Sequence, residues 1–153
     1  MSIHVYVRSA SPADIRQWLD RDEDRENLPS FRELSLGRDW DALHFLLTGS
    51  VSGGRGPRAF LKSGGLFVQR GGNDRLFRPF MVRRIHAALT ALRMPLIRPR
   101  FKPHKMEKAG VYLGSWDYDP PHEGELFDLV KELKAFVRGA SSRGDWLTYA
   151  DDA

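Results

Sequence analysis

The first residues of the chain alternate in polarity with a period of two. Ile3, Val5 and Val7 are separated by His, Tyr and Arg side chains, which predicts a strand with one buried face. A helix start follows, because Ser11 can cap a first turn whose positive end favours the carboxylate of Asp14. The chain is therefore expected to begin with a strand and a helix.

Three longer helices are predicted by apolar residues that recur at spacings of three or four. They cover residues 38–48, 79–93 and about 123–141. Gly49 suits the left-handed conformation that follows the end of the first helix. Three prolines exclude one continuous helix over residues 94–110. The last of the three helices has the clearest apolar stripe, made of Leu126, Leu129, Val130, Leu133, Phe136, Val137 and Ala140.

Shorter apolar pieces complete the predicted sheet. We expect an extended piece over 31–36, a hairpin formed by 59–61 and 66–68 around a Gly-Gly turn, and a closing strand over 146–149. No internal repeat or linker divides the sequence. The pattern therefore predicts one α+β domain over residues 1–153, with a small mixed sheet packed by about three main helices.

Composition restricts the chemistry more than the fold. The 153 residues are 41% hydrophobic and 29% charged, which suits one folded core. The absence of cysteine excludes a thiol nucleophile, a thiolate metal ligand and a disulfide framework. The five histidines show no metal-binding spacing, and no nucleotide-binding loop or serine-hydrolase elbow is present. We therefore predict no metal, no cofactor and no recognisable catalytic motif. Without a signal sequence or a membrane-spanning apolar run, the expected location is the cytosol.

The net charge of +4 conceals an uneven distribution. Residues 51–110 carry 14 basic and 2 acidic side chains, whereas the segments on either side are acidic. Such a middle segment either pairs with the acidic ends of the chain or presents a positive face to an anionic partner. Phenylalanines interspersed among the basic residues of 75–108 make nucleic acid one such partner, although no known nucleic-acid-binding signature is present. The candidate anion-binding residues are Arg83, Arg84, Arg98, Arg100 and Lys102.

The helix predicted over 38–48 concentrates polar chemistry next to Trp40. Asp41, His44 and Thr48 lie three and seven residues apart, so they share one helix face. A carboxylate one turn before an imidazole can orient it and raise its pKa, as a general base requires, and Thr48 would then contact a ligand. The alternative is structural, with His44 in the core and the Thr48 hydroxyl bonded to its own last turn. We favour the structural interpretation, because carboxylate–histidine pairs near a core are often structural.

Three stretches of the sequence resemble one family. They are WDALHFLLTG (Trp40–Gly49), the pair Tyr112 and Trp116, and LVKELKAFVRGASSRGDWLTY (Leu129–Tyr149). Together with a Gly-Gly turn and a central amphipathic helix, they resemble the YfbM-like family of small bacterial proteins, which carry a domain of unknown function. The resemblance covers most of the chain and implies a single α+β domain, but no agreed activity, substrate or catalytic residue. The sequence Arg78-Pro79-Phe80-Met81 departs from the Pro-Glu-Glu-type helix start usual in such proteins, so a partner inferred from the basic charge would belong to this member alone.

These observations favour a non-catalytic binding or interaction protein, for example one that neutralises a toxin by binding it. One alternative is an enzyme or small-ligand binder built on Asp41, His44 and Thr48, which requires these side chains to line an open pocket. The other is binding of nucleic acid or another anionic partner through residues 75–108.

Overall fold

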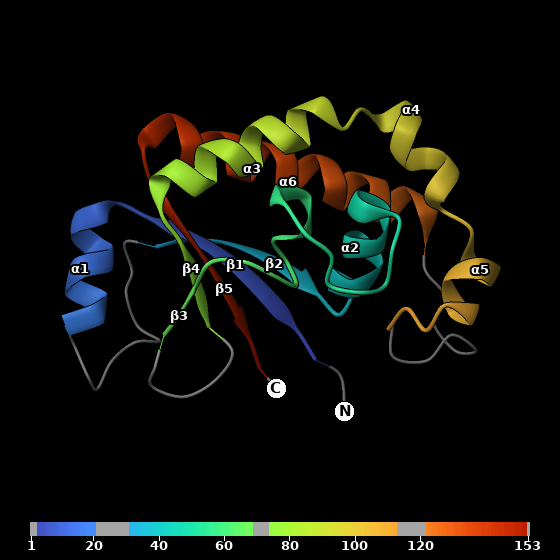
Figure 1. Ribbon diagram of the computed structural model, residues 1–153, viewed down its shortest axis with the longest axis horizontal. Helices are drawn as coiled ribbons and strands as arrows, with labels where there is room; N and C mark the ends of the chain where they lie inside the picture. Colours follow the sequence, from blue (N-terminus) through green and yellow to red (C-terminus); the bar gives the residue numbers. More distant parts are fainter. Residues whose placement is uncertain (1–2, 21–30, 69–73, 113–121, 153) are drawn as a thin grey trace.

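The computed structural model describes residues 3–20, 31–68, 74–112 and 122–152. These residues form a five-stranded sheet in the order β2-β1-β5-β4-β3 (Figure 1). Every neighbouring pair of strands in it is antiparallel. The strands are β1 (Val5–Ala10), β2 (Arg32–Gly37), β3 (Leu66–Phe67), β4 (Arg75–Phe77) and β5 (Trp146–Asp151). The expectation of a mixed sheet is therefore wrong for the described strands.

Six α-helices lie in the described residues, twice the number of main helices expected. They are α1 (Pro12–Asp20), α2 (Trp40–Thr48), α3 (Pro79–Ala91), α4 (Met94–Ile97), α5 (Pro103–Lys108) and α6 (Glu123–Arg143). Two 3-10 turns, η1 (Pro57–Ala59) and η2 (Arg98–Arg100), accompany them. The prolines of 94–110 explain most of the difference: each stands in the first turn of α4, η2 or α5, where its missing N–H costs nothing. They exclude one long helix and start three short ones.

The long helices α3 and α6 lie side by side on one face of the sheet and run in opposite directions (Figure 1). Each buries an apolar stripe, for example Val82 and Ile85 of α3 against Val130 and Leu133 of α6. Because the chain crosses this face once in each direction between β4 and β5, β5 returns antiparallel to β4. This passage is the physical reason that the sheet is not mixed at this point.

The opposite face of the sheet is covered in part by α1. Ile15 and Trp18 of α1 form a second apolar cluster with residues whose side chains alternate away from the main core, including Leu76 of β4. The helix begins as the sequence predicts, since the backbone N–H of Asp14 donates to Ser11 Oγ at 3.1 Å. Within the described residues, no helix is both long enough and apolar enough to cross a bilayer.

The hairpin expected from 59–61 and 66–68 does not form. Pro57 instead starts the η1 turn, and β3 pairs with β4, with Phe67 opposite Arg75. The turn before β3 requires glycine at position 65, where φ is +78° and a Cβ atom would lie 2.8 Å from the Leu76 carbonyl oxygen. The glycine-rich segment therefore closes tightly over β4 and leaves residues 51–64 as a long loop beside α2 and α3.

Candidate functional site

The candidate residues of α2 serve different purposes in the folded chain. Asp41 is 3% exposed. Its Oδ2 accepts the backbone N–H of Tyr112 at 2.7 Å, and its Oδ1 lies 2.5 Å from Lys62 Nζ without a well-directed hydrogen bond. Lys62 Nζ also donates to the Val51 carbonyl at 2.6 Å and lies 5.6 Å from the centre of the Trp40 ring. The carboxylate thus holds a lysine that the sequence analysis did not single out.

His44 has no exposed surface. Its Nε2 lies 2.7 Å from the Ser52 carbonyl oxygen, which only a protonated Nε2 can satisfy, and Nδ1 has no hydrogen-bond partner among the described residues. Burial lowers the pKa of His44 below its usual value, and the Ser52 carbonyl offsets only part of that effect. The imidazole is therefore neutral and internal, and it contacts Ser52 rather than Asp41.

Thr48 closes the C-terminus of α2. Its hydroxyl lies 2.9 Å from the His44 carbonyl oxygen and 3.0 Å from that of Ser50. Gly49 follows with φ of +76° and donates to the Phe45 carbonyl, so the helix ends as predicted. Asp41, His44 and Thr48 share a helix face but do not converge on a common ligand position.

Trp40 does line a pocket, on the side of the loop that faces the sheet. This charged pocket has a volume of about 410 Å³ and is lined by Trp40, Gly53, Leu61, Lys62, Phe67, Arg75, Tyr149 and Asp151. Phe67, Arg75 and Tyr149 occupy matching positions on three adjacent strands, so their side chains point to the same face. With Asp41 behind Lys62, two positive and two negative side chains of the described residues meet here, and their formal charges balance.

Arg75 is the buried cation of this pocket, at 5% exposure. It donates to the Gly64 carbonyl at 3.0 Å and to the Leu61 carbonyl at 2.7 Å, and its guanidinium lies 4.4 Å from the centre of the Tyr149 ring. Burial, and then the charge of Asp151, raise the pKa of Tyr149 to about 12. The phenol is therefore protonated at neutral pH and cannot serve as a base.

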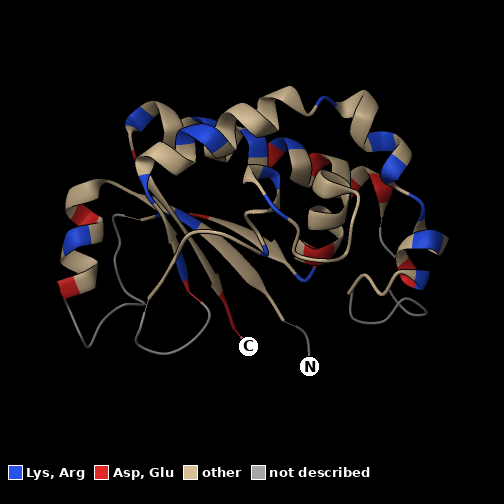
Figure 2. Cartoon of the chain, in the orientation of Figure 1, with Lys and Arg blue, Asp and Glu red and all other residues tan. Residues whose placement is uncertain are grey.

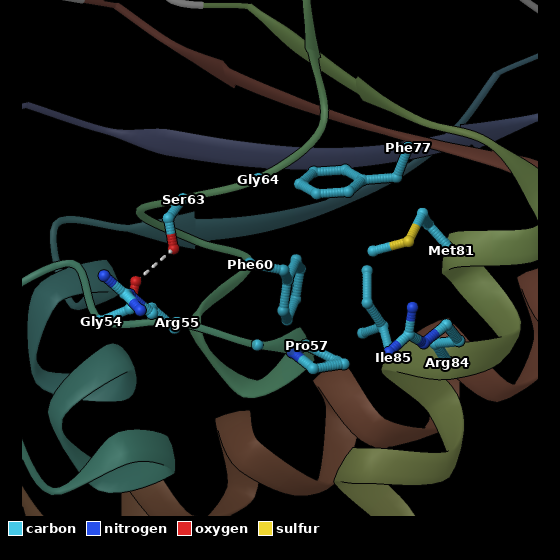
Figure 3. A pocket seen from close by; sticks show the side chains of 11 residues that line it. Gly54, Arg55, Pro57, Phe60, Ser63, Gly64, Phe77, Met81, Arg84 and Ile85 are labelled. Carbon is cyan, nitrogen blue, oxygen red and sulfur yellow. Dashed lines mark hydrogen bonds between the residues drawn. The ribbon is translucent and has the colours of Figure 1, made fainter.

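A second, apolar pocket lies on the other side of the same loop, between the loop and α3 (Figure 3). We call it the loop–α3 pocket. Its volume is about 340 Å³. It is lined by Gly54, Arg55, Gly56, Pro57, Phe60, Ser63, Gly64, Phe77, Met81, Arg84 and Ile85.

The walls of the loop–α3 pocket come from elements that are fixed by their own contacts. Phe60 and Phe77 meet edge to face, with ring centres 6.0 Å apart. Ser63 Oγ lies 3.2 Å from the Gly54 carbonyl oxygen, the contact drawn in Figure 3, and 3.1 Å from that of Ala59. Met81 lies on the pocket side of α3 and faces Phe77. The cavity is therefore present without a ligand.

The sequence profile of the domain of unknown function DUF1877 matches residues 1–148 of this chain. The chain belongs to the DUF1877 family. Its fold is similar to the crystal structure of YfbM from Escherichia coli, a protein of unknown function, with a TM-score of 0.74 and 22% sequence identity over 97% of this chain and 99% of that one. No match is found among curated proteins. The predicted YfbM-like family is thereby confirmed, and no activity accompanies it.

The basic residues proposed for anion binding are dispersed in this DUF1877 domain. Arg83 and Arg84 belong to α3, Arg98 and Arg100 to η2, and Lys102 precedes α5; Figure 2 shows the basic positions spread along this part of the chain. Arg83 and Arg84 are both exposed, and of the two only Arg84 lines the loop–α3 pocket. Arg98 lies 5.8 Å from the Phe127 ring centre, and Arg100 donates to the Leu46 and Leu47 carbonyls at 2.9 and 3.0 Å. Lys102 is exposed immediately before α5.

Sequence reasoning missed the loop–α3 pocket of the DUF1877 domain, because its lining comes from a loop, a strand and a helix. The available signal is the run of glycines before Pro57, a composition that by itself indicates only a connection between elements. Among the described residues, no three His, Asp or Glu side chains gather closely enough to hold a metal ion. Trp116, named in the resemblance, lies outside the described residues.

Proposed function

We propose that this DUF1877 domain is a non-catalytic binding protein that takes a small ligand into the loop–α3 pocket. One observation supports this above all: the apolar cavity of about 340 Å³ between the loop and α3. Ligand sites in proteins are concave, mostly apolar and largely formed in advance, with volumes of roughly 300–1,000 Å³. The cytosolic location predicted from the sequence stays part of this proposal.

The non-catalytic part of the proposal rests on how the candidate catalytic groups are used. A general base must reach a substrate proton, and His44 has no exposed surface and bonds to Ser52. Asp41 is occupied by Lys62 and by the Tyr112 amide. Tyr149, with its raised pKa, holds its proton at neutral pH. None of these groups faces the apolar cavity.

A protein partner is a second candidate function, and toxin neutralisation would be one form of it. Leu66 and Phe67 of β3 are 44% and 71% exposed, and the large exposed ring of Phe67 is a side chain of the kind enriched at protein interfaces. Nucleic-acid binding through 75–108 stays a prediction, and the engagement of Arg75 and Arg100 by backbone carbonyls removes two of its phosphate contacts.

The loop–α3 pocket is tested by filling it. We expect the neutral fluorophore N-phenyl-1-naphthylamine, which brightens in apolar sites, to bind the wild-type protein saturably with one site per chain. Met81→Trp places a larger side chain in the cavity, and we expect it to weaken binding by about tenfold or more.

Met94→Trp is the matched control, because Met94 is also partly buried against the core but does not line the pocket. Thermal unfolding of both variants shows whether each remains folded. Equal binding by the two variants, or no saturable binding by the wild type, would contradict the proposed function.

A further inference from the structure

We infer that the ligand of the loop–α3 pocket is an anionic amphiphile, with an apolar body in the cavity and a carboxylate or phosphate bound by Arg84, while Arg55 across the pocket adds a second positive charge. This inference rests on the proposed function and goes beyond it, because the cavity alone does not specify charge. Figure 3 shows Arg84 beside Ile85 on α3, and Arg55 across the pocket next to Gly54.

The interior of the pocket requires an apolar body. Its deeper wall is made of Phe60, Phe77, Met81 and Ile85, which offer no hydrogen bonds. Among the described residues of the lining, Ser63 has the one hydroxyl group, and its single proton is directed to backbone carbonyls. A polar group buried at this depth would lose its water without gaining a partner, at a cost of roughly 1–3 kcal/mol. The ligand must therefore carry its polar group toward the arginines.

The charge of the lining selects an anion. The described lining contains two arginines and no Asp or Glu. Within the described residues, neither Arg55 nor Arg84 makes a hydrogen bond or an ion pair, in contrast to Arg75 and Arg100, whose guanidinium groups are bound to carbonyls. Two uncompensated cations beside an apolar cavity raise the local concentration of anions and repel cations.

Arg84 is positioned for this purpose by its own helix. Its guanidinium lies 5.7 Å from the ring centre of Phe80, one turn earlier on α3. Contact with an aromatic face orients the planar guanidinium and leaves its N–H donors available. Guanidinium groups bind carboxylates and phosphates through two parallel hydrogen bonds. The geometry therefore favours one anionic group rather than a neutral hydroxyl.

A series of ten-carbon compounds that differ only in the head group tests the charge. Sodium decanoate, decyl phosphate, 1-decanol and decyltrimethylammonium are used to displace N-phenyl-1-naphthylamine from the wild-type protein. We expect the two anions to bind about tenfold more tightly than decanol, and the cation to bind most weakly. Equal affinity for decanol and decanoate would overturn the inference and leave the proposed function standing, whereas failure of the neutral fluorophore to bind would overturn the proposed function.

Arg84→Gln removes one cation from the pocket, and Arg83→Gln is its matched control, because Arg83 is the neighbouring residue of α3, is likewise exposed and does not line the pocket. We expect Arg84→Gln to weaken binding of decanoate and decyl phosphate by about tenfold, with decanol affinity unchanged, and Arg83→Gln to change neither. The same loss of anion affinity in both variants would show a nonspecific charge effect and overturn the assignment to Arg84. Raising the salt from about 0.05 to about 0.5 M should reduce the preference for the anions.

Phosphate groups also occur on membrane lipids. Flotation of the protein with lipid vesicles distinguishes binding to a membrane from binding to a dissolved amphiphile. We expect the protein to stay in solution with vesicles of phosphatidylcholine containing phosphatidylglycerol, because the apolar part of the site lies in a recess between the loop and α3 and does not protrude toward a membrane surface. Binding to these vesicles that is lost in Arg84→Gln would overturn the assignment to a dissolved ligand.

Discussion

The two sides of the loop at residues 51–64 place basic side chains in opposite situations. On the sheet side, Lys62 is paired with Asp41, and Arg75 is bound to two carbonyls. On the α3 side, Arg55 and Arg84 lie at an apolar cavity and have no hydrogen-bond or ion-pair partner among the described residues. Buried charges that satisfy one another are typical of structure, whereas uncompensated charges beside a cavity are typical of recognition.

The sheet side of the loop, which we call the charged side, holds in place the loop that forms one wall of the apolar pocket. Lys62 donates to the Val51 carbonyl, His44 to that of Ser52, and Arg75 to that of Gly64. Each of these bonds joins the loop to α2 or the sheet, or links two parts of the loop. We therefore expect changes on the charged side to act mainly on stability, and changes on the α3 side to act mainly on binding.

The largest effect is expected from Asp41→Ala. The change leaves the Lys62 ammonium group without a counter-charge, with its side chain only 19% exposed, and leaves the Tyr112 N–H without its acceptor. Breaking a buried pair in this way costs about 3–5 kcal/mol of the free energy of unfolding, measured in urea. The exposed Asp128→Ala on α6 serves as the control and should cost less than about 0.5 kcal/mol.

The double variant Asp41→Asn with Lys62→Met tests whether the cost of Asp41→Ala comes from the unpaired charge that is left on Lys62. It removes both charges while it keeps an acceptor for Tyr112 and similar side-chain volumes, so we expect it to recover more than half of the lost stability. If Asp41→Ala cost less than about 1 kcal/mol, the charged side would not be the structural half of the molecule.

The elements that the sequence predicted best are those whose signals are local. The alternation at Val5 and Val7 appears as β1, the Ser11 cap begins α1, and Gly49 ends α2 with a left-handed residue. Of the stripe expected for α6, five residues including Leu133 are buried, and Leu129 and Phe136 are partly buried against the core. Spacing, capping and turn chemistry depend only on neighbours in the sequence, so they can be interpreted without knowledge of the tertiary fold.

The pairings that were missed depend on distant residues. Asp41 has its charged partner 21 positions later, and no local pattern distinguishes Lys62 from other lysines. The strand at 66–67 could pair with either apolar neighbour, and the start of η1 at Pro57 removed one of them. The loop–α3 pocket combines three elements, so its lining could be identified only after α3 had been placed over the loop.

The next effect concerns the pH dependence of the loop attachment through His44. Because burial lowers the folded-state pKa, protonation favours the unfolded chain, and the stability contributed by His44 is lost as pH falls below its unfolded pKa of about 6.5. Between pH 7.5 and 5.5 the wild type should lose about 1 kcal/mol more than His44→Gln, which cannot titrate. Urea unfolding at each pH measures this difference, in which the contributions of the other histidines cancel. Parallel pH profiles would mean that His44 titrates alike in both states.

The smallest expected effect is the stability lost when Arg100 or Arg98 is replaced. It distinguishes these two anion-binding candidates from Arg84, whose replacement is expected to affect ligand binding. Arg100→Met removes the donors to the Leu46 and Leu47 carbonyls at the C-terminus of α2. We expect a loss of only about 0.5–1 kcal/mol, because Arg100 is half-buried and water can reach the freed carbonyls. Arg98→Met removes a contact with the Phe127 ring and should cost less. Since η2 contributes no residue to the loop–α3 pocket, decanoate should bind both variants as it binds the wild type. A loss of decanoate affinity in Arg100→Met, with no change in Arg84→Gln, would place the anion site at the end of α2 instead of at the apolar cavity.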